Sequence, residues 1–523
     1  MDTKALRQKI LDLAIRGKLV PQDPNDEPAS VLLERIREQK QQMVREGKLK
    51  KKDIKNDSVI FVGEDNLHYE KFADGSMKCI EDAIQFELPK GWQWVRCANI
   101  INLYSGQDLT PDRYNEVGDG IPYITGASNL ENGKIIINRW TTTPTTHSAV
   151  GDLLLIVKGS GVGKMAFNDI EDVHIARQIM ALRCSPAILE YYLFVVISSL
   201  LQNIISQANG IIPGIRREII LTTLIPVPPL NEQSNIGTAV KKLLFLVKKL
   251  EDDKNSLLNS LRLARFKILD LAIRGQLEPQ DPDDEPASVL LERIQAEKKE
   301  LIKQGKIKHD KKESTIFRGE DNSYYEIIDN KTICIDEEIP FDLPASWIWC
   351  RLKSLAAPHE NSFVDGPFGS NLKTDHYTEN REVRIIQLNN IGEFTWKNSG
   401  VKYTTYRHAE LLERCKSYPG DIVIAKMMPA GRTIIIPDIE DAYVISSDCV
   451  RLQLPEYIDN EYIMFMINSP TINAYILKYV QGIGRTRTSL GKLKELLIPL
   501  PPYNQQVHIS MFFKKVFNYF DVI

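Results

Sequence analysis

A near-identical block occurs twice in this chain, once at residues 10–36 and once at residues 268–294. The copies differ only at Lys18/Gln276, Val20/Glu278 and Asn25/Asp283. Weaker matches follow each copy and end in a motif of the form I-x-F-x-L-P-x-x-W-x-W, which starts at Ile84 and again at Ile339. The copies lie much farther apart than the roughly 20–50 residues of a solenoid repeat. The sequence therefore predicts one large module that is present twice.

Length and composition favour a globular chain of several domains. At roughly 150 residues per domain, 523 residues correspond to three or four domains. The 43% hydrophobic and 26% charged residues exclude a largely disordered, collagen-like or membrane-embedded chain. The longest apolar run, residues 191–201, is shorter than the roughly 20 residues of a membrane span, and the charged N-terminus does not resemble a signal peptide. We therefore expect a cytoplasmic protein without a membrane partner.

Between the repeated blocks the sequences of the two halves diverge, although short segments rich in Gly, Asp and Pro recur at corresponding places. Gly151-Asp152 and Gly420-Asp421 each precede an apolar run, and each half ends on a proline-rich segment, at residues 225–229 and 498–502. Short β-branched runs separated by Gly, Pro and Asn predict mixed α/β domains. A shared framework with different interiors is expected of one scaffold that carries two recognition surfaces.

A long heptad pattern follows the first proline-rich segment. Apolar residues recur at alternating spacings of four and three over residues 231–274, which predicts a helix roughly 60 Å long with a coiled-coil partner. Gly275 is suited to end it, and a second helix is predicted at residues 287–303. The two termini continue the pattern and, by the repeat alignment, together rebuild a second copy of the long helix. The predicted seam residues are Ile236, Val240, Leu243, Val247, Leu250, Leu257, Leu261, Ile509, Phe513, Val516 and Phe520.

These patterns predict two mixed α/β domains on an antiparallel coiled coil of long helices, related by a pseudo-two-fold axis. The alternative is two unrelated amphipathic surface helices, which the matching register disfavours. The predicted regions are an N-terminal helical region at 1–58, a first recognition domain at 59–226, a central helical spacer at 227–313, a second recognition domain at 314–499 and a C-terminal helix at 500–523.

The doubled block I-R-G-x-L-x-P-Q-D-P-x-D-E-P-A-S, the I-P-x-P-P closures and the paired variable domains resemble the specificity subunit of a Type I restriction-modification system. The resemblance extends over essentially the whole chain. It implies two target-recognition domains that each read one half of a split sequence in double-stranded DNA. It also implies that the shared helices set the spacing and dock two methyltransferase subunits, to which restriction subunits add.

The resemblance further implies a chain that is not catalytic by itself and binds no cofactor. S-adenosylmethionine, ATP and magnesium are expected in the partner subunits. An alternative within the same class is the specificity subunit of a related bipartite system whose methyltransferase and nuclease are fused. A self-sufficient methyltransferase or nuclease and a coiled-coil scaffold without a DNA role are the alternatives from other classes.

Motifs for catalysis are incomplete in this sequence. The segment 158–165 resembles a phosphate-binding loop, but Gly159 is one residue too close to the Gly-Lys pair and Met165 replaces the hydroxyl residue. At residues 500–503 the sequence is L-P-P-Y, where an amino-methyltransferase would carry a polar residue in place of Leu500. The acidic clusters at residues 169–172 and 438–441 are interpreted as polar turns. No metal site is predicted, and the four tryptophans of the repeated motif are expected to pack in the interior.

Basic and hydroxyl residues in the divergent interiors are the candidates for DNA contact. Arginine suits guanine edges and lysine suits phosphates, whereas glycine allows the backbone to approach a phosphate. In the first domain the predicted residues are Lys158, Ser160, Lys164, Arg177, Arg216 and Arg217. In the second domain they are Lys426, Arg432, Arg485 and Arg487. Each of them could instead be an ordinary solvated surface charge.

Overall fold

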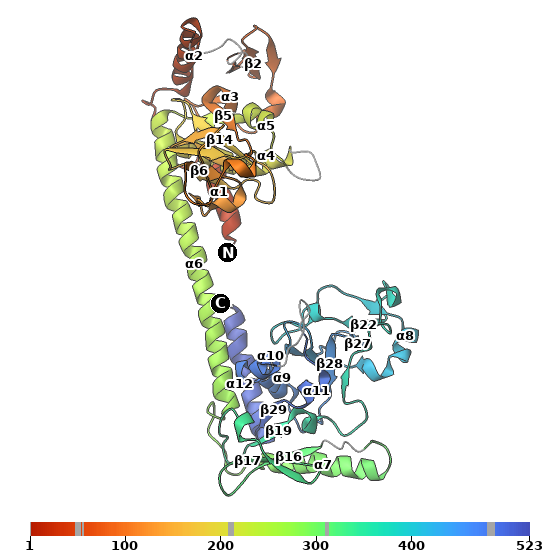
Figure 1. Cartoon of the computed structure of the whole chain (residues 1–523). Coiled ribbons are helices and arrows are strands. Elements are labelled where there is room, and N and C mark those ends of the chain that lie inside the picture. Colours follow the sequence, from red (N-terminus) through yellow and green to blue (C-terminus); the bar gives the residue numbers. More distant parts are fainter. Residues whose placement is uncertain are drawn as a thin grey trace. The chain divides into compact units, whose positions relative to one another are not determined.

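The computed structural model describes residues 2–47, 54, 57–207, 214–308, 313–478 and 487–522 (Figure 1). The chain forms two compact units, unit 1 at residues 1–255 and unit 2 at residues 256–523. Each unit combines several sheets with helices, and the 44-residue helix α6 (Leu230–Ile273) contributes residues to both. The predicted mixed α/β fold with a long helix is confirmed. The five predicted region boundaries are a finer division and stay predictions.

Unit 1 contains five helices besides its part of α6, and fifteen strands in its described residues. The helices are α1 (Thr3–Ile15), α2 (Ala29–Arg45), α3 (Cys97–Ile100), α4 (Glu190–Ser206) and α5 (Arg217–Thr222). The strands are β1 (Ser58–Val62), β2 (His68–Phe72), β3 (Met77–Cys79), β4 (Gln93–Arg96), β5 (Ile101–Ser105), β6 (Ile121–Ile124), β7 (Leu130–Glu131), β8 (Lys134–Ile135), β9 (Trp140–Thr141), β10 (His147–Ala149), β11 (Leu153–Ile156), β12 (Met165–Phe167), β13 (Asp172–Ile175), β14 (Ile179–Cys184) and β15 (Leu224–Val227).

Unit 2 repeats this inventory with small changes. Its helices are α7 (Ala287–Lys303), α8 (Tyr406–Leu411), α9 (Asn460–Asn468), α10 (Pro470–Lys478), α11 (Leu490–Lys494) and α12 (Tyr503–Val522). The strands are β16 (Ser314–Arg318), β17 (Tyr324–Ile328), β18 (Lys331–Cys334), β19 (Ile348–Arg351), β20 (Phe363–Asp365), β21 (Tyr377–Thr378), β22 (Val383–Ile386), β23 (Tyr403–Thr404), β24 (Lys416–Ser417), β25 (Ile422–Ala425), β26 (Thr433–Ile435), β27 (Tyr443–Ile445), β28 (Cys449–Leu452) and β29 (Leu497–Leu500).

The sheets of the two units share one topology. The sheet β12-β11-β14-β5 of unit 1 corresponds to β26-β25-β28-β20 of unit 2, and all of its pairings are antiparallel. A second sheet in each unit contains one parallel pair, β6 with β13 and β22 with β27. The repeated W-x-W strand pairs with the proline-rich strand that closes its half, β4 with β15 and β19 with β29. The duplication predicted from short sequence blocks therefore extends through the divergent interiors.

In each unit α6 pairs with a terminal helix in antiparallel fashion. In unit 1, Arg7 near the start of α1 forms an ion pair of 2.7 Å with Glu251, whereas Asp26, which follows α1, accepts a hydrogen bond from Asn231 at the start of α6. In unit 2, Arg265 of α6 lies over the rings of Phe517 and Phe520 near the end of α12. Asp284, which follows α6, accepts from Asn504 at the start of α12. The paired termini predicted from the heptad register are thus present within each unit.

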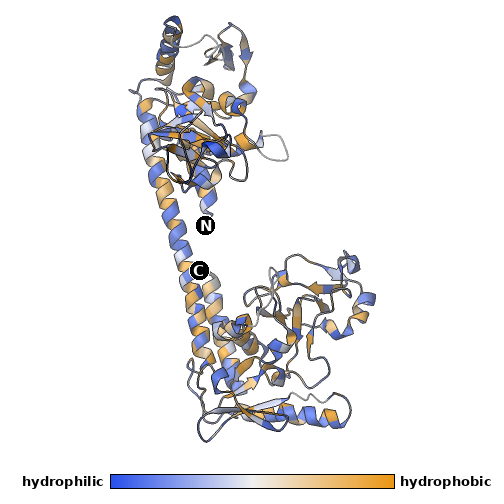
Figure 2. Ribbon diagram, in the orientation of Figure 1, coloured by the Kyte–Doolittle hydropathy of each residue, from blue (hydrophilic) through white to orange (hydrophobic). Residues whose placement is uncertain are grey.

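The predicted seam is buried toward both ends of the helix pairs and exposed in the middle of α6. Figure 2 shows apolar positions recurring along this helix. Ile236, Val240, Val247, Ile509 and Phe513 are buried, and Leu243, Leu261, Val516 and Phe520 are half-buried. Leu250 is 46% exposed in unit 1 and Leu257 is 47% exposed in unit 2. The central part of the seam therefore presents leucine side chains that no described helix of the same unit covers.

The helix ends follow from local sequence. Gly275 has φ 64°, in the left-handed region, and its N–H donates to the carbonyl oxygen of Ala272 after the last turn of α6. The helix α7 begins at Ala287 after Pro286, as predicted, and α12 begins at Tyr503 directly after the prolines that end β29. All four tryptophans of the repeated motif are buried, which confirms that they pack in the interior.

A buried ion pair recurs at the same framework position of both units. In unit 2, Arg351 (8% exposed) donates to both carboxylate oxygens of Glu326 (3% exposed) at 3.0 and 2.6 Å. In unit 1, Arg96 pairs with Glu70 in the same way. Burial alone would raise the pKa of the Glu326 carboxyl, but the hydrogen bonds and the charge of Arg351 outweigh it, so that the pKa is lowered. The ionised pair is therefore part of the folded core.

We expect the substitution Arg351→Ala to destabilise unit 2 by about 3–5 kcal/mol, because it leaves the buried carboxylate of Glu326 without its counter-charge. Urea unfolding followed by tryptophan fluorescence measures the loss. As a control, Arg318→Ala removes an exposed pair with Asp342 and should cost about 0–1 kcal/mol. Because the folded-state pKa of Glu326 lies below 4.5, the contribution of the pair is complete above that pH and is lost as the pH falls below it. Equal losses for both variants would contradict the assignment.

Candidate nucleic-acid interface

One hairpin in each unit carries several of the predicted basic residues. The loop between β11 and β12, residues 157–164, corresponds to the loop between β25 and β26, residues 426–432. In unit 1 the N–H of Ile156 donates to the carbonyl oxygen of Lys164 at 2.9 Å, and in unit 2 the N–H of Ala425 donates to that of Arg432 at 2.8 Å. Lys164 and Arg432 therefore occupy the same hairpin position.

A glycine precedes each of these two basic residues for a steric reason. Gly163 has φ 92° and Gly431 has φ 86°, in the region that side chains rarely adopt. A Cβ atom at Gly163 would lie 2.9 Å from the Leu201 side chain, and one at Gly431 would lie 2.7 Å from that of Ile476. The hairpin is thus held close to α4 in unit 1 and to α10 in unit 2, and the position of the following basic residue is fixed by the backbone.

A segment distant in sequence joins each hairpin. The N–H of Ile215 donates to the carbonyl oxygen of Val157, and the N–H of Thr488 donates to that of Lys426, both at 2.9 Å. These bonds place Arg216, Arg217 and Arg487 next to the hairpin loops. The structure brings together residues that sequence reasoning had only grouped by charge.

The predicted residues differ in how freely they can meet DNA. Lys158, Ser160, Arg216 and Arg487 are exposed. Arg177 is exposed but pairs with Asp108 at 2.7 Å, Lys164 donates to the carbonyl oxygen of Ala127, and Arg217 donates to that of Leu103. Arg432 is half-buried, and Lys426 is buried in an ion pair of 2.6 Å with Asp365. Arg485 lies outside the described residues. The charge of Lys426 is already compensated, so that the exposed residues are the better candidates for DNA contact.

A third loop at the same edge was missed by sequence reasoning. It follows β5 in unit 1 and β20 in unit 2, and it starts at Gly106 and Gly366, whose N–H groups donate to Ile179 and Cys449. A Cβ atom at Gly366 would lie 1.9 Å from the carbonyl oxygen of Ser446, so only glycine allows this close approach. In unit 2 the loop presents Phe368, which is 80% exposed. The signal in the sequence is an aromatic residue between Gly366-Pro367 and Gly369.

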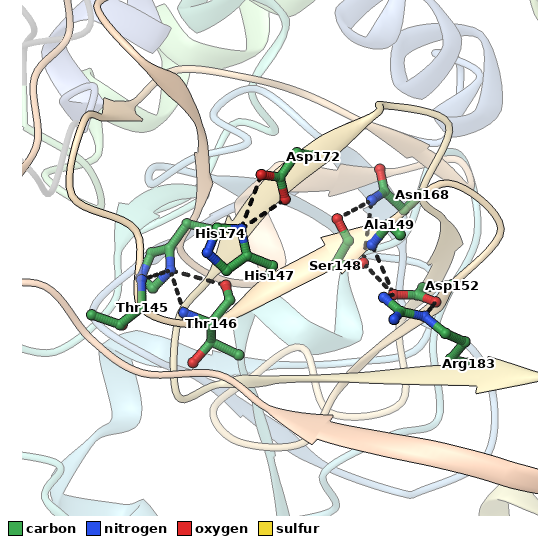
Figure 3. A network of polar contacts seen from close by, with 10 residues as sticks. All are labelled: Thr145, Thr146, His147, Ser148, Ala149, Asp152, Asn168, Asp172, His174 and Arg183. Atoms are coloured by element: carbon green, nitrogen blue, oxygen red, sulfur yellow. Dashed lines mark hydrogen bonds and ion pairs between the residues drawn. The ribbon is translucent and has the colours of Figure 1, made fainter. Parts of the chain in front are cut away.

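A buried polar network supports this loop in unit 1 (Figure 3). The buried His174 ring contacts the carbonyl oxygen of Gln107 through Nε2 at 3.0 Å, and the N–H of Thr146 lies 3.2 Å from Nδ1. Nδ1 also lies 3.0 Å from the carbonyl oxygen of Thr146, and burial lowers the pKa of His174. The ring therefore ties the loop after β5 to the strand β10 region.

The same figure shows an ion pair and a histidine–carboxylate contact in this network. Asp152 accepts from Arg183 at 2.8 and 2.9 Å and also from the N–H of Ala149, and His147 contacts Asp172 at 2.9 Å. We interpret the network as a structural support for the loops, because its buried members, Asp152, Asn168 and His174, are hydrogen-bonded within the protein.

Neither metal ligands nor a membrane span are found in the part of the chain that the structure describes. Among these residues no group of three or more His, Cys, Asp or Glu side chains could hold a metal ion. No described helix is long and apolar enough to cross a membrane. The arrangement presents exposed loops with basic, hydroxyl and aromatic side chains, which suits contact with a phosphate backbone and base edges.

Comparison with known proteins identifies the family. Residues 89–259 and 378–523 match the family model of the Type I restriction modification DNA specificity domain. The chain belongs to this family. It is 27% identical to the Type I restriction enzyme EcoEI specificity subunit of Escherichia coli and 28% identical to the EcoAI specificity subunit of the same organism. Each alignment covers 97% of this chain and 87% of the relative.

A solved structure shows a similar chain. The HsdS subunit from Thermoanaerobacter tengcongensis aligns with a TM-score of 0.43 and 16% identity, over 83% of this chain and 91% of that one. By the family match and the two relatives, the chain is a specificity subunit of a Type I restriction-modification system, as its repeated blocks had indicated.

Proposed function

We propose that this chain reads a bipartite target in double-stranded DNA, with one half-site per unit. The observation that carries the proposal is the pair of equivalent loop sets with different side chains. The hairpin loop of unit 1 carries Lys158, Ser160 and Lys164, and the equivalent loop of unit 2 carries other residues at these positions. The backbone hydrogen bonds that hold the loops are the same in both units. Different side chains on one framework read different bases.

The repeated framework indicates how many partner subunits this chain binds. Asn231 with Asp26 and Asn504 with Asp284 form the same 2.7 Å hydrogen bond in the two units, at the junction of the helix pair and the repeated block. Two equal surfaces suit two equal partners, which we propose to be methyltransferase subunits. Restriction subunits would join through these. S-adenosylmethionine, ATP and magnesium would be carried by the partners, and this chain would supply recognition and no catalysis.

The alternative within the class is a partner in which methyltransferase and nuclease are fused. It leaves the proposed role of this chain unchanged, since recognition and docking would use the same surfaces. The mass of the purified partner distinguishes the two systems.

A methylation assay tests the proposed function. With labelled S-adenosylmethionine and DNA, the purified chain alone is expected to transfer no label, whereas the chain with its methyltransferase subunit labels two adenines or cytosines in a split site. The mass of the saturated complex should correspond to two methyltransferase subunits per chain. Label transfer by the isolated chain, or one methyltransferase per chain at saturation, would contradict the proposal.

A further inference from the structure

Unit 2 contains an open cavity of about 510 Å³ whose wall is rich in cations. It lies between the end of α7, the segment 353–364 that follows β19, and α11. We call it the unit 2 cation cavity. Its cationic side chains are Lys298, Lys308, Lys353, Arg414 and Lys494, and its acidic side chains are Glu313 and Glu360. A concave wall with an excess of one charge sign concentrates counter-ions of the other sign.

The positive charges of the cavity are only partly compensated within the protein. Lys353 is paired with Glu495 at 2.9 Å, and the Nζ atom of Lys298 donates to the carbonyl oxygen of Ser354 at 3.3 Å. Lys494 lies over the ring of Phe363, with Nζ 5.8 Å from the ring centroid, and Arg414 is exposed. The cavity therefore keeps cationic groups that an anion could contact.

A buried residue lies in the wall of the cavity. Ser354 is 7% exposed, and its Oγ atom has no hydrogen-bond partner among the described residues. The Oγ atom itself is buried, so that a ligand in the open cavity would contact the cationic side chains and not this hydroxyl. Lysine and arginine side chains are common ligands of phosphate oxygens.

The corresponding place in unit 1 has fewer cations, although Asn99, at the position of Ser354, likewise has a buried side-chain oxygen without a hydrogen-bond partner among the described residues. The alignment of Trp94 with Trp349 puts Ala98 at the position of Lys353, and the alignment of β15 with β29 puts Leu221 at the position of Lys494. The counterpart of Lys298 is Lys40, which forms an ion pair of 3.2 Å with Asp57. Since the framework is shared, the added cations of unit 2 are a property of this cavity and not of the fold.

We propose that the unit 2 cation cavity binds a phosphate group, with Arg414 and Lys494 contacting its oxygens. The phosphate could belong to a nucleotide, whose size the cavity admits, or to the DNA backbone. The site is separate from the hairpin loops proposed to read bases.

Titration calorimetry of the full chain with inorganic phosphate and with ADP tests the site. Saturable binding is expected for at least one probe, weakened about tenfold by Lys494→Gln and by Arg414→Gln, as the loss of one charge-assisted hydrogen bond predicts. Lys494→Arg keeps the charge and should retain binding. Lys40→Gln, at the unit 1 position that matches Lys298, should leave binding unchanged. Thermal unfolding of each variant shows that unit 2 remains folded.

A second measurement distinguishes the source of the phosphate. If neither probe binds, the slope of log K against log salt for duplex DNA should fall by about two in the double variant Lys494→Gln with Arg414→Gln, which identifies the DNA backbone as the ligand. Absence of probe binding together with an unchanged slope would overturn the proposal, as would probe binding that both variants retain. If the wild-type chain with its methyltransferase subunit methylates no split site, the proposed function is contradicted. The proposal that the cavity binds phosphate is then unaffected, because it is tested by calorimetry.

Discussion

Exchange of residues 86–226 for the same region of a relative with another target is expected to replace one half of the methylated sequence and to leave the other half unchanged. The exchanged region carries all the loops of unit 1 that meet at the candidate interface, including those of Lys158 and Lys164. It begins and ends close to the paired strands β4 and β15, so that both partners of this sheet are exchanged almost entirely together. Sequencing of methylated bases in cells that express the hybrid measures the result.

Two further variants sharpen the exchange experiment. Lys158→Ala combined with Lys164→Ala should weaken DNA binding for all sequences and lower the salt slope by about two, because lysine contacts phosphates and not bases. Lys78→Ala, an exposed lysine on β3 away from these loops, serves as the matched control. A hybrid in which both half-sites change would contradict independent reading by the two units.

Insertion of four residues after Asp253 is expected to lengthen the preferred spacer by one or two base pairs while both half-sites stay the same. Four residues add about 6 Å of helix, and a base-pair step is about 3.4 Å. Four is close to the period of 3.6 residues per turn, so the apolar seam is approximately retained. The insertion falls between Leu250 and Leu257, which are exposed, and thus disturbs no buried helix contact.

The spacing prediction is checked by methylation of a DNA library in which the spacer length varies. Insertion of seven residues, one heptad, should lengthen the spacer by about three base pairs, since it adds roughly 10 Å. An insertion of four residues in the exposed turn at Gly118 leaves α6 unchanged and should keep the original spacing. An active α6 insertion that still prefers the original spacing would contradict the role of the helix as a ruler.

Sequence patterns that span only a few residues made the helices predictable. The bounds expected for α6 differ from the observed ones by one residue at each end, and those of α7 agree, because heptad spacing, Gly275 and Pro286 act within a few residues of the chain. The pairing of α6 with the termini was also predictable, since the repeat alignment compares one half of the chain with the other. Burial of the W-x-W tryptophans followed from their matched positions.

The availability of individual charges was decided only by the tertiary structure. Lys426 was predicted to contact DNA, and its ion pair with Asp365 depends on the pairing of β20 and β25 with the strand between them. Likewise, only the structure shows that the same backbone hydrogen bond holds Lys164 and Arg432 in their hairpins.

The sequence by itself determined the family, the duplication and the helices, because these depend on periodicity and on residues close together in the chain. Only the tertiary structure decided which loops meet at one edge of each unit, that Leu250 and Leu257 are exposed, and that unit 2 has a cationic cavity beside the buried hydroxyl of Ser354. These features depend on contacts between residues far apart in sequence, whose partners are chosen by packing and by the satisfaction of buried polar groups.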